Sequence, residues 1–424
     1  MFRKIKDHLY FIVAQYFRHW ALIQLSLWKP RVVVVTGSNG KTTLLHLLEA
    51  QFQTQARYSH HANSTYGIPF DILGLKRKTF SPWEWVGLFV LAPIRAWKTP
   101  PKEKIYIVEA DAERPGEGRF LSALLQPEVA VWLSCARTHS QQFDTLVATG
   151  IFANVDEAIA YEFGYFVERT QKLVLAQADD ALIDAQRRRV TAAWRGISHR
   201  ESLQQYAVTK TGTHFQIHGM DYHFPYLLPQ QTAEAIVAVQ LVTQYFDQPF
   251  DVSFSHLVMP PGRSSLFSGI RNTTIIDSSY NANVASVEAI LSMMHQLSAQ
   301  NKWVILGDLV QQGTQEKEEH EKLATLFRKD QVDRIVLVGP RLAQFTLPKL
   351  RDLEQKGVRI TSFIEPRDAL DFLLESLTGN EVLLFKGARF LEGIIEHLLV
   401  NSADVQKLCR REAHWQRRRR QWSL

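Results

Sequence analysis

The sequence predicts an α/β protein built from mostly parallel sheets, and three observations support this prediction. Strand-like runs of β-branched and apolar residues alternate with helical patterns from residue 31 to residue 399. A glycine-rich turn joins the first strand, residues 32–35, to a helical pattern. The length of 424 residues, with 46% hydrophobic and 22% charged residues, suits about two to three globular domains.

The first 30 residues are basic and then apolar, and they predict one amphipathic helix. Apolar residues recur there at helical spacing, at Phe2, Ile5, Leu9, Ile12 and Tyr16. Charged residues interrupt the apolar run and no small-residue cleavage site follows, so a signal peptide is not indicated. Two placements fit this pattern: the helix packs on the protein body, or residues 1–28 lie on a membrane as a peripheral contact.

The turn after the first strand has the composition of a phosphate-binding loop. Its candidate nucleotide-binding residues are Gly37, Ser38, Asn39, Gly40, Lys41, Thr42 and Thr43. The two glycines let backbone N–H groups face an anion, and Lys41 adds a positive charge for the outer phosphates. The Thr42 hydroxyl can bind Mg²⁺. We therefore expect the chain to bind a nucleoside triphosphate, ATP, with Mg²⁺.

The rest of the first half continues the α/β pattern. Strands are predicted at residues 105–110, 129–134 and 172–177, with a helix at 115–125. The apolar stretch 85–92 is too short to span a bilayer, and we expect it to pack as a core helix or a lid. Residues 190–228 change to period-two alternation with glycine turns, which predicts an antiparallel patch before a helix at 231–246.

A second α/β unit follows a break at residues 246–251. Its predicted strands are 273–277, 302–308, 333–340, 358–363 and 381–388, and its predicted helices are 284–297, 316–330, 366–377 and 390–399. We predict an N-terminal helix (1–30), a central P-loop domain (31–248), a C-terminal Rossmann-like α/β domain (249–405) and a basic tail (406–424).

Two polar residues follow predicted strands near the phosphate loop. Glu109 closes the strand at 105–110, and His139 comes a few residues after the strand at 129–134. Ligands of open α/β sheets bind at the carboxyl ends of the strands. Glu109, His139 and Thr42 are therefore candidate Mg²⁺ ligands, although a strand-end carboxylate can also be solvated and a loop histidine can bond locally.

Cysteine content and charge narrow the class of protein. Two cysteines make no disulfide framework and cannot form a four-cysteine zinc ribbon, and a reducing cytoplasm fits this usage. The net charge of +6 is concentrated in the arginine-rich tail, whose tryptophans alternate with basic residues. We expect a solvated, poorly ordered terminus there, with contact to a membrane as the alternative and nucleic-acid binding unlikely.

The order of these features resembles the Mur ligase family, most closely its MurF branch. The matching segments are TGSNGKTT (36–43), NSTYGIP (63–69), EADAERPGEGRFL (109–121), QPEVAVWLSCARTHSQQF (126–143), AQADD (176–180), PGR (261–263), DSSYNANVAS (277–286), LGDLVQQG (306–313) and KGAR (386–389). These motifs occur in the family's order along most of the chain.

The resemblance implies an ATP-dependent, ADP-forming peptide ligase of peptidoglycan precursor synthesis that acts through an acyl phosphate. A muropeptide-like carboxylate and an amino-acid or dipeptide amine would be its substrates. By motif position, Lys41 and Thr42 hold the phosphates and first metal, and Glu109 and His139 hold metal near the acyl phosphate. The resemblance assigns the nucleotide and amine side of the cleft to Arg263, Asp277, Tyr280, Asn281 and Asn283.

The chain departs from the family pattern at several positions. Many members carry a carbamylated lysine after the histidine, but no lysine lies between Lys104 and Lys172. We hypothesise that Glu162, or less favourably Glu157, supplies this catalytic carboxylate, with a surface helix position as the alternative for both. Ser278 replaces a second aspartate, and Glu234 replaces an asparagine near the adenine.

The N-terminal region is the departure that bears most on the substrate. Only residues 1–30 precede the phosphate-loop strand, where MurF has a domain that grips the UDP-linked substrate. Two other functions stay open: a different Mur-like carboxylate–amine ligase, similar to folylpolyglutamate synthase, and a nucleotide-dependent scaffold at a membrane or nucleic acid. The protein is expected in the cytoplasm, with membrane association as the alternative.

Overall fold

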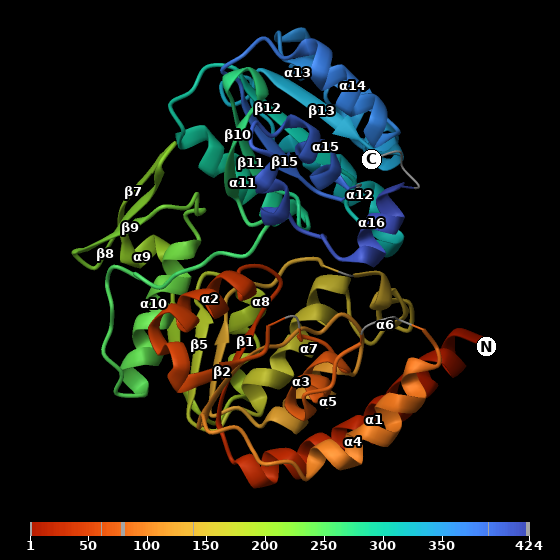
Figure 1. The fold of residues 1–424 in the computed structure, drawn as a ribbon, viewed down its shortest axis with the longest axis vertical. Helices are drawn as coiled ribbons and strands as arrows, with labels where there is room; N and C mark the ends of the chain where they lie inside the picture. Colours follow the sequence, from red (N-terminus) through yellow and green to blue (C-terminus); the bar gives the residue numbers. More distant parts are fainter. Residues whose placement is uncertain (1, 61, 78–80, 139, 389, 421–424) are drawn as a thin grey trace. The chain divides into compact units, whose positions relative to one another are not determined.

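The computed structural model describes residues 2–60, 62–77, 81–138, 140–388 and 390–420, and their side chains from residue 9 onward. The chain forms two compact units (Figure 1). The first contains Met1–Ala136, Gln142–Ser198 and Glu234–Leu257, and the second contains Arg137–Gln141, His199–Ala233 and Val258–Leu424. The domain boundaries predicted at residues 30, 248 and 405 stay predictions.

A six-stranded parallel sheet forms the centre of the first unit, in the order β2-β3-β1-β4-β5-β6. The strands are β1 (Arg31–Thr36), β2 (Ala56–Tyr58), β3 (Ile105–Glu109), β4 (Val129–Trp132), β5 (Leu173–Gln177) and β6 (Ala193–Ile197). The strands predicted at 105–110, 129–134 and 172–177 are confirmed. The predicted antiparallel patch is wrong for its first residues, because β6 pairs in parallel with β5.

Helices cover both faces of this sheet. The core on one face joins β1, β3, β4 and β5 to α1 (Phe2–Trp28), α3 (Gly67–Leu73), α4 (Glu84–Ala96), α5 (Glu117–Leu125) and α7 (Val155–Glu168). The alternate strand residues, among them Val33 and Val35, are also buried, and α2 (Lys41–Phe52) and α10 (Thr232–Tyr245) lie on that face (Figure 1). Burial on both faces explains the continuous apolar runs of the strands.

Helices α1 and α4 lie side by side at the edge of the first unit (Figure 1). The Tyr16 hydroxyl of α1 donates to the Phe89 carbonyl of α4 at 2.7 Å. Buried residues of both helices join the core: Ala14, Phe17, Ala21, Trp28, Leu88, Ala92 and Ala96. Helix α1 therefore packs on the protein body, one of the two placements that its sequence allowed.

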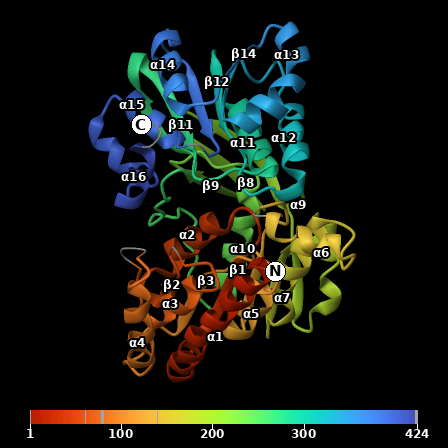
Figure 2. The same ribbon diagram turned by 90° about the vertical axis from the view of Figure 1, so that its right-hand side faces the viewer.

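The second unit contains a mixed six-stranded sheet, in the order β10-β11-β15-β12-β13-β14. Its strands are β10 (Ser265–Gly269), β11 (Thr273–Ser278), β12 (Lys302–Gly307), β13 (Arg334–Val338), β14 (Arg359–Phe363) and β15 (Val382–Lys386), and only β10 is antiparallel. Helices α11 (Val284–Gln296) and α12 (Glu316–Thr325) pack on one face, and α14 (Pro366–Ser376) and α15 (Leu391–Leu398) pack on the other (Figure 2). This confirms the predicted strand and helix order, except that β10 and the short helix α13 (Arg351–Gln355) were not predicted.

A small antiparallel sheet also belongs to the second unit. It is formed by β7 (Leu203–Thr209), β8 (Gly212–Ile217) and β9 (Met220–Phe224). Burial alternates along β8, as the period-two sequence pattern predicted. The remaining short helices are α6 (Asp144–Ala148), α8 (Ala181–Asp184), α9 (His199–Ser202) and α13 (Arg351–Gln355).

The basic tail is helical and partly packed over its described residues, so the expectation of a poorly ordered terminus is wrong there, while Arg417, Arg418 and Arg420 are exposed as a solvated tail predicts. The tail ends in α16 (Ala413–Arg420), and Arg419 is buried. Arg411 and Arg419 both form ion pairs with Glu396 of α15, at 2.7 and 2.9 Å. Carboxylates on α15 thus pair with part of the tail's charge, which its local sequence did not reveal.

Candidate functional site

The turn between β1 and α2 has the backbone conformation of a phosphate-binding loop. Gly37 and Gly40 have φ values of 120° and 83°, a region that L side chains rarely adopt. A Cβ atom on Gly37 would lie 2.8 Å from the Ser134 carbonyl oxygen. Glycine is therefore required at residue 37 by both its backbone angle and the close approach of the chain after β4.

The two residues between these glycines are anchored to the same neighbouring segment. The Ser38 hydroxyl donates to the Ala136 carbonyl at 2.6 Å and accepts the Ala136 N–H at 2.8 Å. The Asn39 N–H donates to the Ser134 hydroxyl at 2.8 Å. These bonds hold the loop before any phosphate binds, which lowers the conformational cost of binding.

Lys41 is buried at the start of α2 and has two oxygen partners. Its ammonium donates to the Gly37 carbonyl at 2.5 Å and forms an ion pair with the Asp111 carboxylate at 2.8 Å. Asp111 follows the end of β3 by two residues and is itself buried. The sequence reasoning did not assign a role to Asp111, although the residue lies inside the matched segment 109–121.

Thr42 and Glu109 meet at the carboxyl edge of the sheet, as their positions predicted. The Thr42 hydroxyl donates to the Glu109 carboxylate at 3.0 Å. The Glu109 N–H donates to the Ser59 hydroxyl at 3.0 Å, which links the ends of β3 and β2. Thr43 is half-buried one residue further along α2. His139, the third predicted metal ligand, lies outside the described residues.

Glu162 is buried on α7, and its carboxylate is bonded to the start of α5. Its two oxygens accept the N–H groups of Gly116 and Gly118, at 2.9 and 3.0 Å. Burial raises the pKa of Glu162, and these backbone bonds oppose the rise. The contacts are those of a helix cap, so they lend no support to the metal-binding hypothesis, which stays a prediction.

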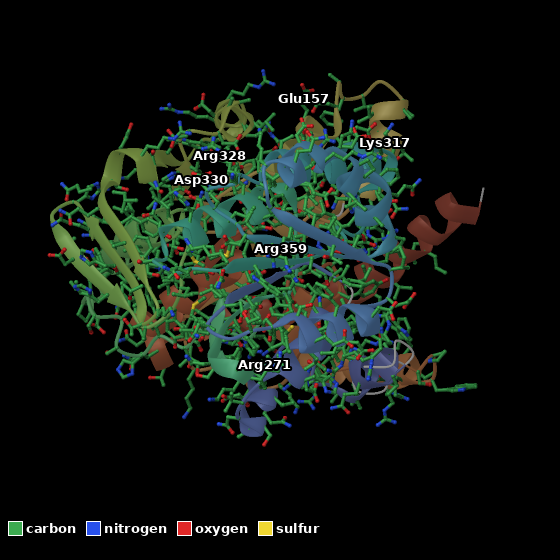
Figure 3. The ribbon with its side chains drawn as sticks, turned by 90° about the horizontal axis from the view of Figure 1, so that it is seen from above. Glu157, Arg271, Lys317, Arg328, Asp330 and Arg359 are labelled. Carbon is green, nitrogen blue, oxygen red and sulfur yellow. The ribbon has the colours of Figure 1, made fainter. Side chains whose placement is uncertain are left out.

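Glu157, the less favoured candidate, belongs to the cap of its own helix. Figure 3 labels this residue. Its carboxylate accepts the Ala153 N–H at 3.3 Å and the Asn154 side-chain amide at 3.1 Å. Asn154 in turn caps the first turn of α7 by accepting the Glu157 N–H at 2.9 Å. This arrangement is local and accounts for Glu157 without a metal.

Two of the matched sequence segments are joined through Glu117. Its carboxylate accepts the hydroxyls of Thr65 and Tyr10, at 2.6 and 2.8 Å. Burial raises the pKa of Glu117, and the bond from Thr65 opposes this. The Asp111 N–H also donates to the Asn63 carbonyl at 2.9 Å. The segments 63–69 and 109–121 therefore support the loop that carries Asp111.

In the second unit, the predicted nucleotide-side residues gather at the end of β11. Asp277 is fully buried, and one of its oxygens accepts the Ser279 N–H and hydroxyl, at 3.0 and 2.6 Å. Its other oxygen accepts no hydrogen bond from the described residues. The Arg263 guanidinium lies over the half-exposed ring of Tyr280, 4.4 Å from its centroid. The unsatisfied, buried oxygen of Asp277 is a polar group whose hydrogen bonding a ligand could complete.

Asn281 and Asn283 lie just before the first residue of α11. The Asn281 side chain accepts the N–H of the next residue at 2.8 Å. Asn283 forms a capping box with Ser286: its side chain accepts the Ser286 N–H at 2.8 Å, and its own N–H donates to the Ser286 hydroxyl at 3.0 Å. A structural role therefore accounts for the Asn283 side chain.

Lys386, at the end of β15, is a buried residue to which the sequence reasoning gave no role. Its pKa is lowered to about 7, first by burial and then by the charge of Arg263, while the charge of Asp277 opposes the change. The signal was present in the sequence, since Lys386 opens the matched segment KGAR. Two residues that depart from the family pattern are buried as well: Ser278 at the end of β11 and Glu234 on α10.

Comparisons with known proteins identify the family of both halves. Residues 35–230 match the Mur ligase middle domain, and residues 262–389 match the Mur ligase glutamate ligase domain. The UDP-N-acetylmuramoyl-tripeptide–D-alanyl-D-alanine ligase of Bacillus subtilis is 25% identical over 87% of this chain and 76% of its own length. The enzyme of the same name from Borreliella burgdorferi is 22% identical over 84% of this chain and 72% of its own length.

Solved structures show the same fold. The MurF ligase of Thermotoga maritima in complex with ADP superposes with a TM-score of 0.71 at 20% identity, covering 93% of this chain and 84% of that chain. The folylpolyglutamate synthase of the same organism gives a TM-score of 0.52 at 13% identity, covering 97% and 99%. At these identities the likeness concerns the fold alone.

Proposed function

Because the chain belongs to the Mur ligase family, we propose that it is an ATP-dependent, ADP-forming amide ligase of the MurF type. One observation carries the proposal: Lys41, Thr42, Glu109 and Asp111 converge at the carboxyl edge of a parallel sheet, beside a preformed phosphate loop. A nucleotide placed there meets backbone N–H groups, the ammonium of Lys41 and hard oxygen donors.

The proposed reaction has two steps. A carboxylate oxygen of the acceptor attacks the γ-phosphorus of ATP, and the bond from this phosphorus to the β-phosphate oxygen breaks. ADP is released, and the acceptor carries an acyl phosphate. An amine then attacks the acyl carbon, its proton is lost, and inorganic phosphate leaves as the amide forms. In this chain Lys41 would exchange its ion pair with Asp111 for the phosphates, and so would balance the charge of the transferring group.

The donor atoms near the loop fit Mg²⁺. The Thr42 hydroxyl and the Glu109 carboxylate present oxygen atoms 3.0 Å apart, and oxygen is the ligand that Mg²⁺ prefers. We propose that these residues, together with His139, would hold the ion. When bound, Mg²⁺ would supply charge neutralisation at the phosphates. The roles of Arg263, Asp277, Tyr280, Asn281 and Asn283 at the nucleotide stay proposals of the same kind.

Phosphate release with defined substrates tests the ligase proposal. The names of the relatives suggest a UDP-N-acetylmuramoyl-tripeptide as the carboxylate and D-alanyl-D-alanine as the amine. We expect ADP and phosphate to appear only when both are present, and an amide product of matching mass. Folate with glutamate, and single amino acids as amines, serve as alternative substrate pairs. ATP hydrolysis that only vesicles or nucleic acid stimulate would refute the ligase and favour the scaffold.

We further propose a peripheral membrane contact through residues 1–28 and the adjacent α4. No described helix has the length and hydropathy needed to span a bilayer. Large apolar side chains are nevertheless exposed on both helices: Leu9, Ile12, Leu22 and Leu27 on α1, and Val86, Val90, Leu91 and Ile94 on α4, with Trp83 and Trp97 flanking α4. The expectation that residues 85–92 pack as a core helix therefore holds for only one face of α4.

The chemistry of this surface suits an anionic lipid interface. Trp83 and Trp97 are 83% and 67% exposed, and tryptophan is enriched where bilayer and water meet. Exposed lysines follow α4 at Lys98, Lys102 and Lys104. Contiguous exposed apolar side chains mark interaction sites, and flanking basic residues add attraction to anionic lipids. A cytoplasmic location stays a prediction.

Sedimentation with lipid vesicles tests this contact. Deleting residues 1–28 would remove Phe17 and Trp28 from the core, so point substitutions are preferable. Val86→Asp with Val90→Asp should lower partition onto phosphatidylglycerol vesicles by about tenfold or more, because two charged side chains would then have to enter the apolar part of the interface. Val258→Asp with Val400→Asp, at exposed valines of the second unit, is the matched control. Equal partition of both variants would refute the contact.

A further inference from the structure

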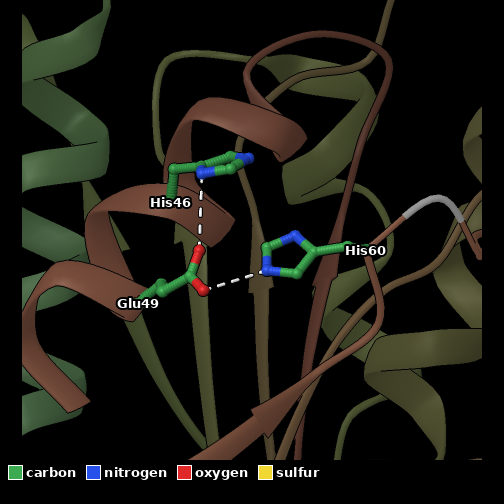
Figure 4. Close-up of side chains that lie close together, drawn as sticks. All are labelled: His46, Glu49 and His60. Atoms are coloured by element: carbon green, nitrogen blue, oxygen red, sulfur yellow. Dashed lines mark hydrogen bonds and ion pairs between the residues drawn. The ribbon is translucent and has the colours of Figure 1, made fainter. Parts of the chain in front are cut away.

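Three metal-ligating side chains converge on one side of α2 in the first unit (Figure 4). His46 and Glu49 belong to α2, and His60 follows β2. The Glu49 carboxylate lies 3.4 Å from Nδ1 of His46 and 3.0 Å from Nε2 of His60. One ligand atom from each residue lies within 4.8 Å of the others. No part of the proposed ligase reaction uses these residues.

The local structure holds the three side chains together. Residues three apart on a helix share a face, so His46 and Glu49 are neighbours by their spacing. His60 is positioned by Ser59, whose N–H donates to the Ile107 carbonyl at 3.1 Å and whose hydroxyl accepts the Glu109 N–H at 3.0 Å. The two imidazole rings lie 5.1 Å apart at an angle of 33°. The ligands therefore come from two segments with supported backbones.

The spacing is compatible with one small ion between the three groups. Zn²⁺ binds imidazole nitrogen and carboxylate oxygen at about 2.0–2.2 Å, which puts neighbouring ligand atoms of a tetrahedral site about 3.3 Å apart. The two nitrogen–oxygen distances, 3.4 and 3.0 Å, run to different oxygens of the Glu49 carboxylate, so a small shift of the side chains would let one ion bind both imidazoles and this carboxylate. The side chains are 16%, 37% and 35% exposed, which leaves a side open for a water molecule as fourth ligand.

We propose that His46, Glu49 and His60 bind a divalent transition-metal ion, with Zn²⁺ as the representative ion. Two histidines and one carboxylate with an open position form a known zinc ligand set, and imidazole also suits the neighbouring transition metals. Of the candidate Mg²⁺ ligands, Thr42 and Glu109 offer oxygen and His139 offers one imidazole, whereas the site proposed here has two imidazoles and one carboxylate. The two sites therefore differ in their share of nitrogen ligands, although Thr42 and His46 stand one helical turn apart on α2.

Competition with a chromophoric zinc indicator tests the proposal on the tag-free, full-length protein. The protein is titrated with ZnCl₂ in saturating Mg²⁺, so that oxygen-rich sites are filled. We expect one Zn²⁺ per chain. His46→Ala with His60→Ala should weaken binding by a hundredfold or more, and Glu49→Gln should weaken it by tenfold or more. Thermal unfolding in EDTA checks that each variant is folded.

A second histidine pair provides the matched control. His214 and His223 stack with ring centroids 4.5 Å apart, and Asp221 lies 2.9 Å from His214. His214→Ala with His223→Ala removes the same number of imidazoles and should leave zinc binding unchanged. Wild-type binding no tighter than that of the His46/His60 variant, or an equal loss in the control, would overturn the proposal. Zinc binding is measured without substrates, so its result tests the zinc site separately from the ligase activity.

Discussion

Replacing Asp111 with asparagine tests how Lys41 is held before a nucleotide binds. The ammonium of Lys41 has two oxygen partners, the Asp111 carboxylate at 2.8 Å and the Gly37 carbonyl at 2.5 Å. The side chains of Lys41 and Asp111 are 8% and 9% exposed, so water cannot replace the lost carboxylate. The substitution keeps the shape of the side chain but leaves a buried positive charge without its counter-charge.

The expected loss of stability is large for a single substitution. Removing one partner of a buried ion pair costs about 3–5 kcal/mol, and the remaining bond to Gly37 favours the lower end, about 3 kcal/mol. For a unit of this size, that corresponds to a fall in the unfolding midpoint of about 6–12 °C. A bound triphosphate restores negative charge beside Lys41, so ATP should stabilise the Asp111→Asn variant more than the wild type.

Thermal unfolding of both proteins, with and without ATP and Mg²⁺, measures these effects. Glu128→Gln is the control, because its partner Arg31 is 45% exposed in a 2.6 Å surface ion pair. That change should cost about 1 kcal/mol or less. The reasoning is refuted if Asp111→Asn unfolds at the wild-type temperature, or if ATP raises the midpoint of the variant no more than that of the wild type.

Three further substitutions separate structural from functional roles. Lys386 is charged in the unfolded chain up to pH 10.5 but has a folded pKa of about 7, so above pH 7 the unfolded state binds more protons and stability should rise with pH. Measured by urea unfolding between pH 7 and 9, the free energy of unfolding of the wild type should rise relative to that of Lys386→Met by up to about 1.4 kcal/mol per pH unit. The same pH dependence of this free energy in both proteins would contradict the expectation. Glu162→Gln should lower the free energy of unfolding by about 2 kcal/mol through the lost cap of α5. If Glu162 also binds metal, as predicted, the variant needs more Mg²⁺ for half-saturation, and an unchanged half-saturating Mg²⁺ concentration would refute that role. Asn283→Ala should cost about 1 kcal/mol by loss of the cap of α11, and weaker ATP binding at unchanged stability would instead place Asn283 at the nucleotide.

Much of the fold was predictable because its signals are local. The strands of both central sheets are continuous apolar runs, and the helices between them repeat apolar residues at helical spacing. The prediction was wrong where residues outside a segment determine how that segment pairs or packs. The strand Ala193–Ile197 alternates like an antiparallel strand but pairs in parallel with β5 at the edge of the sheet. Glu396 on α15 pairs with both Arg411 and Arg419, so this part of the tail packs although its local charge predicted solvation.

In the candidate site, too, some contacts were predictable from the sequence and others depend on distant partners. Thr42 and Glu109 were placed together from sequence because parallel strands end at one edge of a sheet. Asp111 and Lys386 received no role, because a residue near the end of a strand gives no sign of which buried partner it will meet. The structure adds that the carboxylate of Glu162 bonds the start of α5, which its sequence position did not reveal, and the predicted metal role of Glu162 stays a prediction.

By itself, the sequence determined the phosphate loop and the alternation of strands and helices. Two glycines with positive φ between a β-branched strand and a helix are specified by neighbours in the chain, so no distant contact is needed to recognise them. Only the tertiary structure decided that Lys41 meets Asp111, that one face of α4 stays exposed, and that His60 joins His46 and Glu49. These contacts join segments far apart in the chain, and they depend on sheet order and helix packing, which no local pattern encodes.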